Sequence, residues 1–406
     1  MATRLFPTGF YIEFLEERGL NKTIGTICIS MTLVTSAVSP YIFHRLPESI
    51  KRVSLCKRCL VLFSLNAVFL GLMSFLDLSL EVFPNGELAF PIIFVLRALQ
   101  GVSNGLTFVI VQGELVDLFL KENKQYIVVI SSSLHLANIL CSIMGVRLYT
   151  WGGWLYVGVG ITLLSVLPLF LLPAVYIFQN TLVKNENQGI KSRVQGVNED
   201  ALPVDDSKMT WLRELTYYMP DMAVFINNTM FNLLIYALPA RMVHNLGRDL
   251  DNTILYINLI NVFSFVSALT LGYLAEKMFN AFNVMIVGNL AFYIGCILAF
   301  GSTTNFLSFP AGFEIGAVLV GVGDAAVINL AIMSKFFLYS RWGLSTEGLA
   351  ARATATNNLV FNLAAAAGTV VSGLTLTRES EIPAMATTAA VFFVVSIGIV
   401  ICKIVK

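Results

Sequence analysis

The feature that most constrains this chain is a series of apolar runs, each long enough to cross a membrane. A helix needs about 20 mostly apolar residues to span the hydrocarbon core of a bilayer. Eleven runs of this kind lie near 23–43, 59–78, 89–115, 126–149, 153–177, 217–240, 253–275, 284–302, 308–334, 351–376 and 383–402. Since 56% of the 406 residues are hydrophobic and 13% are charged, a soluble fold could not bury this much apolar surface. The sequence predicts an all-α, multi-pass integral membrane protein that contacts the lipid bilayer.

Composition and motifs also exclude several function classes. The formal net charge is +1, so no basic surface for nucleic acid is expected. The sequence contains no H-E-x-x-H, no G-x-S-x-G and no phosphate-binding loop, and its potential metal ligands do not cluster. We therefore expect neither an enzyme nor a bound metal or cofactor.

A polar stretch divides the apolar runs into two groups, with five runs before it and six after it. Residues 179–213 mix both signs of charge and have no apolar period, which is typical of a flexible cytosolic linker. The predicted organisation is an N-terminal helical bundle over 1–178, the linker over 179–213 and a C-terminal helical bundle over 214–406.

Lysine and arginine residues indicate the orientation in the membrane. If residues 44–58 face the cytosol, 18 of the 26 basic residues lie on the cytosolic side, three of them in 335–352. Seven lie on the opposite side, and Arg97 lies inside the membrane. This excess predicts a cytosolic C-terminus. Plasma, vesicle and endosomal membranes all accept this topology.

The two halves of the chain echo each other. "QGVSNG" (100–105) aligns with "VGVGDA" (320–325), and "SAVSPYIFHRL" (36–46) aligns with "SALTLGYLAEKM" (267–278). Tandem halves in one orientation need an even number of spans each, so six plus six are expected. The opening "RLFPTGFYIEFLEERGL" resembles the end of a first helix whose body is missing; a genuine eleven-span protein is the alternative. Parallel repeats around a midplane site are one plan of secondary transporters.

Several segments resemble the major facilitator superfamily. "LRALQGVSNGL" (96–106), "LGYLAEK" (271–277) and the half-length linker are similar to its motifs. "IEFLEERGLNKTIGTICIS" (12–30), the 242–277 segment and "GLAARATATNNLVFNLAAAAG" (348–368) resemble its vesicular amine and polyamine transporter branch. The resemblance covers nearly the whole chain. It implies two six-helix bundles that rock around a central site and exchange protons for a small organic cation.

Asp324 is the candidate carboxylate of that site. It lies in "VGVGDAAVI", which matches an acidic motif on helix ten of this branch, and about sixteen residues into its span. A charge near the midplane costs at least ~3 kcal/mol, which favours a function over an accident. A carboxyl group there can bind either a proton or a cation, which is the simplest exchange chemistry. A structural carboxylate bonded to neighbouring helices is the alternative.

Four asparagines form two pairs, Asn228 with Asn232 and Asn358 with Asn362. The spacing of four residues places each pair on one helix face. Such amides either line a polar cavity or bond helices together, and the sequence leaves both interpretations open.

Other polar residues in the spans have less specific roles. Arg97 is a candidate gate or internal tie, with Glu314 at similar depth as a possible partner. His135 is either a proton relay or a histidine satisfied in the core or lumen. Asp221 is interpreted as a cap at the cytosolic start of its helix.

A cytosolic loop motif supplies the expected gate. "GYLAEK" resembles the superfamily motif G-x-L-A-D-K/R and contains Gly272, Glu276 and Lys277. The glycine permits close helix approach, and the two charges are expected to lock the inward face and release it as the bundles rock.

Several positions depart from the amine-transporting branch. The first-helix aspartate of the branch would lie in the missing segment, its seventh-helix glutamate falls on Ile235, and its eleventh-helix aspartate falls on Asn358. The helix-five antiporter signature G-x-x-x-G-P-x-x-G appears as "ANILCSIMG" (137–145), and the helix-eleven Gly-Pro appears as Gly368-Thr369. An uncoupled facilitator, and a non-transporting scaffold or sensor derived from a transporter, therefore stay open as alternatives.

Overall fold

The computed structural model describes residues 22–44, 55–79, 90–122, 125–193, 211–246, 250–277, 281–303, 311–341 and 349–375. These residues form helices and no strands, which confirms the predicted all-α architecture. In chain order the helices are α3 (Lys22–His44), α5 (Leu55–Ser79), α6 (Phe90–Glu122), α7 (Gln125–Arg193), α8 (Trp211–Leu246), α9 (Leu250–Lys277), α10 (Ala281–Thr303), α11 (Gly312–Arg341) and α12 (Leu349–Thr375).

α7 consists of two helices joined at a pair of glycines. Gly152 and Gly153 have non-helical backbone angles, and Gly153 has φ 64°, which a residue without Cβ adopts freely. The break separates the predicted spans 126–149 and 153–177. Every predicted span up to 351–376 therefore coincides with a described helix. The span at 383–402 and the expected remnant of a first span lie outside the described residues.

The predicted linker is partly wrong. α7 continues to Arg193 and α8 begins at Trp211, so both ends of the 179–213 stretch are helical. "QNTLVKNENQGIKSR" contains lysine, glutamate, glutamine and arginine, which have good helix propensity. Extending an existing helix also avoids the cost of a new nucleus. The missing apolar period therefore does not exclude a helix.

Many large apolar side chains are exposed on the outside of this bundle, while many polar side chains are buried inside it. Large apolar residues are more than half exposed on the outer faces of several helices, among them Val61, Val95, Leu163, Phe170, Leu255 and Val287. Buried polar side chains include Gln100, Asn227, Asn261, Asp324, Asn329 and Lys335. The interior also contains apolar clusters, for example Leu234, Ile260 and Phe292, so the apolar outer surface is what distinguishes this bundle from a soluble protein. This arrangement suits lipid, which accepts apolar surface and offers polar groups no hydrogen bonds.

By length and composition alone, two described segments are apolar enough to cross a membrane, Ala281–Ala299 and Gly312–Phe336. Two shorter apolar stretches are Leu155–Phe170 and Leu255–Leu271. Inward-facing polar residues lower the apolar content of other helices; α8, for example, buries Asn227, Asn228 and Asn232.

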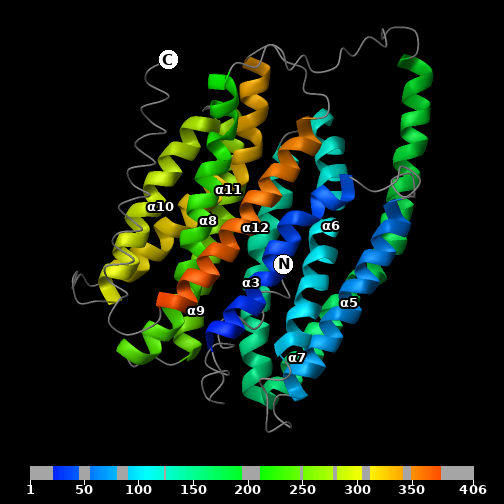
Figure 1. Cartoon of the computed structure of the whole chain (residues 1–406). Coiled ribbons are helices and arrows are strands. Elements are labelled where there is room, and N and C mark those ends of the chain that lie inside the picture. The colour runs from blue at the N-terminus through cyan, green and yellow to red at the C-terminus, as the bar shows by residue number, and fades with distance from the viewer. Residues whose placement is uncertain are drawn as a thin grey trace.

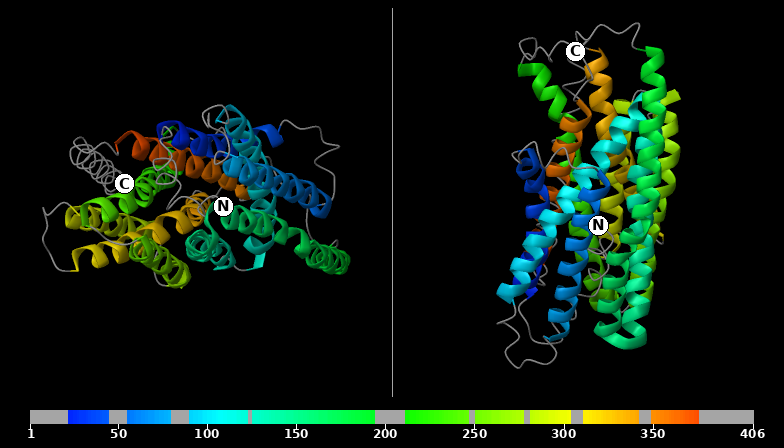
Figure 2. Two further views of the ribbon diagram at one scale, coloured as in Figure 1. Left: turned by 90° about the horizontal axis from the view of Figure 1, so that it is seen from below. Right: turned by 90° about the vertical axis from the view of Figure 1, so that its right-hand side faces the viewer.

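The two halves of the chain lie side by side and meet along two helix pairs. α3 packs against α12, and α7 packs against α9. Figure 1 shows blue α3 next to orange α12, and the view from below in Figure 2 shows the same neighbours. The sequence repeat aligns α3 with α9, so each of these two helices contacts the opposite half. The seam between the halves is therefore built from repeat-related helices.

A close helix contact within each half also follows the repeat. A Cβ added to Gly101 of α6 would lie 2.2 Å from the Thr32 carbonyl oxygen of α3. A Cβ added to Gly321 of α11 would lie 2.5 Å from the Ile260 carbonyl oxygen of α9. Gly101 and Gly321 are aligned in the two repeats, so the structure repeats the packing as well as the sequence. Small residues permit such backbone approach in membranes.

A buried ion pair ties three helices of the C-terminal half together. Lys335 Nζ of α11 lies 2.6 Å from Asp221 Oδ1 of α8. It also donates to Thr356 Oγ1 of α12 at 2.7 Å and lies 5.0 Å from the centre of the Tyr217 ring. Both charged side chains are almost fully buried.

This ion pair corrects two interpretations of the sequence. Asp221 is not a helix cap, because α8 begins ten residues earlier at Trp211. Lys335 is not a cytosolic loop charge, because α11 continues past it to Arg341 and buries it. Polar pairing between distant segments has no local sequence signal, and each residue alone resembles an ordinary charge near a helix end.

We expect Gly321→Ala to destabilise the protein by about 1–3 kcal/mol, because the added methyl group separates α11 from α9. Gly71→Ala is the matched control, since a Cβ there would lie 3.7 Å from its nearest neighbour, the Thr162 methyl carbon. Thermal unfolding in detergent measures both. Equal stabilities of the two variants would contradict the close contact.

We expect Lys335→Met or Asp221→Leu alone to destabilise the protein by about 3–5 kcal/mol, because each leaves one buried charge unpaired. The double variant should recover most of this loss, since both charges are then absent. Thermal unfolding of the four proteins in one detergent tests this. Additive losses in the double variant would exclude the pair as the cause.

Candidate functional site

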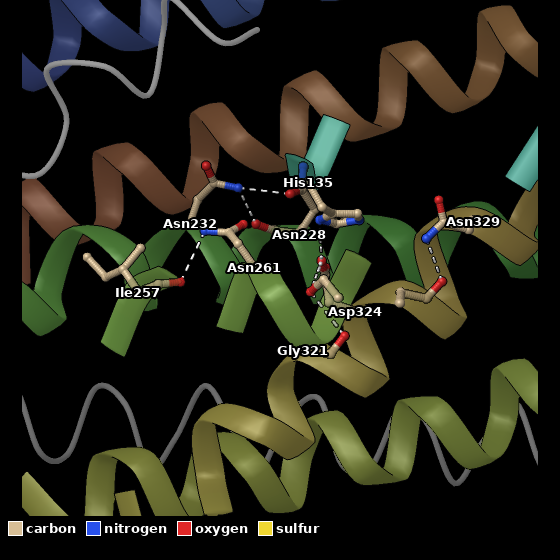
Figure 3. A network of polar contacts seen from close by, with 10 residues as sticks. His135, Asn228, Asn232, Ile257, Asn261, Gly321, Asp324 and Asn329 are labelled. Atoms are coloured by element: carbon tan, nitrogen blue, oxygen red, sulfur yellow. Dashed lines mark hydrogen bonds and ion pairs between the residues drawn. The ribbon is translucent and has the colours of Figure 1, made fainter. Parts of the chain in front are cut away.

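Asp324 lies at the centre of the described polar residues. Its side chain is fully buried, at 0% exposure, on α11. Ser264 Oγ of α9 donates to the Gly321 carbonyl oxygen at 3.0 Å and lies 3.5 Å from Asp324 Oδ2. Figure 3 shows Asp324 and Gly321 beneath His135. Within the described part of the chain, Asp324 Oδ1 has no hydrogen-bond partner, so this carboxyl group keeps acceptor capacity.

His135 brings the other half of the chain to this carboxyl group. His135 belongs to α7, and its Nδ1 lies 3.9 Å from Asp324 Oδ2. That distance suits an ion pair but is too long for a hydrogen bond. The imidazole is 2% exposed, and neither of its ring nitrogens has a hydrogen-bond partner among the described residues. The sequence singled out His135 but could not give its direction; the fold turns it toward Asp324.

A second contact crosses the seam between α7 and α9. Ser142 Oγ donates to Asn258 Oδ1 at 2.5 Å. His135, Asn138 and Ser142 follow a three-then-four spacing and so share one face of α7. The Oδ1 atoms of Asn138 and Asn261 find no partner among the described residues. Ser142 lies in "ANILCSIMG", the counterpart of the antiporter signature. The spacing of these three polar residues is the sequence signal for the shared face.

The first asparagine pair lies on α8. Asn228 Nδ2 donates to the Phe361 carbonyl oxygen of α12 at 2.5 Å. Asn232 Nδ2 donates to Asn228 Oδ1 at 2.9 Å, one turn away (Figure 3). The first bond ties α8 to α12, and the second, within α8, links the two buried amides to each other.

The second asparagine pair repeats this arrangement on α12. Asn362 Nδ2 donates to Asn358 Oδ1 at 2.8 Å, and Asn358 Nδ2 donates to the Ser36 carbonyl oxygen of α3 at 3.3 Å. The latter bond joins the two halves of the chain. An amide therefore occupies the seam where the sequence comparison expected an aspartate.

Arg97 is buried in α6, at 4% exposure. Its Nη1 donates to Gln100 Oε1 at 3.4 Å, a long bond to a neutral group. The proposed partner Glu314 is wrong: its exposed side chain accepts a hydrogen bond from Tyr256 at 3.3 Å, and no ion pair joins it to Arg97. Similar depth in the membrane does not imply contact when the two helices belong to different halves.

The remaining candidates lie beyond what the structure describes in detail. Gly272, Glu276 and Lys277 form the last turns of α9, and their side chains lie outside the described ones. Among the described residues, no three histidine, cysteine, aspartate or glutamate side chains gather in a way that could hold a metal ion.

Comparisons with known proteins place this geometry in a family. The model of the Major Facilitator Superfamily matches residues 1–369. A search of curated proteins finds no match.

Among solved structures, a bacterial homologue of the iron transporter ferroportin has a TM-score of 0.58 and 16% identity, covering 99% of this chain and 97% of that one. The nucleoside transporter NupG has a TM-score of 0.62 and 12% identity, and the match covers 99% of this chain and 97% of that one. The human organic anion transporter MFSD10 (TETRAN) has a TM-score of 0.57 and 13% identity, and the match covers 96% of this chain and 89% of that one. At such identities the likeness shows the fold alone. Since the family model spans most of its length, the chain belongs to the major facilitator superfamily, whose members are integral membrane transporters.

Proposed function

We propose that this transporter exchanges a proton for a small organic cation by alternating access, with Asp324 as the group for which the two compete. One observation carries the proposal. A fully buried carboxyl group, with one oxygen free of partners among the described residues, lies where the two halves of the chain meet.

The chemistry follows from the limited capacity of one carboxyl group. A proton neutralises Asp324, and a cation neutralises it equally well, but the two cannot occupy it together. A buried carboxylate without either is costly. The empty, charged form is therefore avoided, and movement in each direction is coupled to an occupied site.

The position of His135 supports a link between occupancy and conformation. Asp324 moves with the C-terminal half and His135 with the N-terminal half, so the 3.9 Å contact lasts only while that part of the seam is closed. The Ser142–Asn258 bond is subject to the same condition. A solute that binds Asp324 differently in the open and closed seam shifts the balance between the two states.

The other candidate residues take supporting parts in this proposal. Asn228, Asn232, Asn358 and Asn362 present amides near the path of the solute and hold α3, α8 and α12 in register. The 272–277 motif at the end of α9, by resemblance, closes the cytosolic face. The excess of lysine and arginine supports a cytosolic C-terminus.

We expect purified protein in liposomes to take up an organic cation faster when the lumen is acidic, and Asp324→Asn to lose at least about tenfold of that gradient-driven rate. The reason is that an amide cannot exchange a proton with a cation. Glu314→Gln is the control, an exposed acid on the same helix. Radiolabelled amines, polyamines and neutral solutes measure the rates.

Two outcomes of this uptake experiment would contradict the proposal. An uptake rate of the wild-type protein that does not change with the pH gradient would indicate an uncoupled facilitator. Absence of uptake for every solute by folded protein would indicate a scaffold or sensor.

We expect a cross-link between α7 and α9 to stop transport, because the seam must open once in each cycle. Ser142→Cys and Asn258→Cys, in a background whose six native cysteines are replaced by alanine, are joined by a short bifunctional maleimide. Uptake should fall to the rate of empty liposomes. Each single-cysteine protein, treated alike, should keep its uptake. Full uptake by the cross-linked protein would mean that this seam does not move.

A further inference from the structure

Two buried hydrogen-bond donors of α6 lack acceptors, and they lie one turn apart. Arg97 Nε and Gln100 Nε2 have no hydrogen-bond partner among the described residues, although both side chains are buried, at 4% and 0% exposure. The spacing of three residues places them on one face of the helix. Their bond to each other uses the Gln100 oxygen and a different nitrogen of Arg97. The pair therefore offers donors and no remaining free side-chain acceptor of its own.

The charge of Arg97 is also unbalanced. A guanidinium stays protonated in proteins, and a buried charge without a counter-ion is strongly unfavourable. No carboxylate of the described residues pairs with Arg97, and Glu314 is exposed elsewhere. The contrast with Lys335 is direct, since that buried cation has Asp221 at 2.6 Å. Arg97 is thus a buried cation whose counter-ion is missing from the part of the chain that is described.

Anionic oxygen groups satisfy both deficits together. Carboxylates accept hydrogen bonds from arginine with strong, well-oriented geometry. An amide donor such as Gln100 supplies a further bond to the same group. A neutral solute could accept hydrogen bonds from Arg97 and Gln100 but would leave the Arg97 charge without a counter-ion. An inorganic cation would be repelled by that charge.

We propose that Arg97 and Gln100 form a subsite for a carboxylate of the transported solute, so that the solute is a zwitterion whose ammonium group binds Asp324. This inference rests on the proposed function for its cationic end. Asn104 of α6 aligns with Asp324, and Arg97 lies seven residues nearer the start of α6, about 10 Å along the axis. The offset favours a solute whose two charges are separated by several carbon atoms.

Paired solutes that differ only in the carboxylate test the proposal. The pairs are glycine with methylamine, 4-aminobutanoate with propylamine, and 6-aminohexanoate with pentylamine. Binding to the full chain in detergent is measured by the ligand-induced rise in unfolding temperature. We expect at least one longer amino acid to bind about tenfold or more tightly than its matched amine, as loss of a charged hydrogen bond predicts.

Three variants assign any preference to the subsite. Arg97→Gln removes the charge. Gln100→Glu supplies an internal carboxylate that pairs with Arg97 and fills the site. This variant keeps the buried charge neutralised, so it should fold even if Arg97→Gln does not. Both should bring each acid and its amine to equal affinity. Arg147→Gln, which changes an exposed arginine of α7, should keep the preference.

The two proposals fail in different ways. If no acid binds, if none binds better than its amine, or if the preference survives both Arg97→Gln and Gln100→Glu, the carboxylate subsite is overturned while cation binding at Asp324 can stand. If Asp324→Asn leaves amine affinity unchanged, the proposed role of Asp324 fails. A carboxylate preference that Arg97→Gln removes would still support the subsite.

Discussion

The structure depends on one constraint: polar groups inside a lipid-facing bundle can find partners only in the protein or in the solute. The outer faces carry exposed leucine, valine and phenylalanine, and the interior carries amides, hydroxyls and a few charges. Wherever the interior groups satisfy each other, they hold helices together, as Asn228 does between α8 and α12. Asp324 Oδ1 and Arg97 Nε have no such partner among the described residues, and these are the atoms that the proposed solute would bind.

The buried charges fall into two kinds by this criterion. Lys335 and Asp221 neutralise each other within the C-terminal half, so they suit a rigid body that moves as one. Among the described residues, the polar partners of Asp324 are a hydroxyl and a distant imidazole, and that of Arg97 is a neutral amide. Charges that are incompletely neutralised at the centre of a two-part bundle are the expected signature of a transport site rather than of a stable core.

Much of the fold could be read from the sequence because lipid imposes a length and a composition on each span. The runs, the repeat and the family resemblance predicted the helices and the aligned glycines of α6 and α11. The pairing of residues across the seam could not be predicted. Periodicity gives the face of a helix on which His135 or Lys335 lies, but not the helix that this face meets. For that reason the predicted pairing of Arg97 with Glu314 is wrong, and the pairing of Lys335 with Asp221 was not predicted.

Proton release on solute binding tests the central claim most directly. Titration calorimetry of the detergent-solubilised chain, repeated in buffers of different ionisation enthalpy, gives the number of protons released for each solute bound. Competition at Asp324 predicts release of close to one proton per cation at a pH where the free site is protonated, and none from Asp324→Asn. Tight binding of the cation with no proton release at any pH would contradict the account.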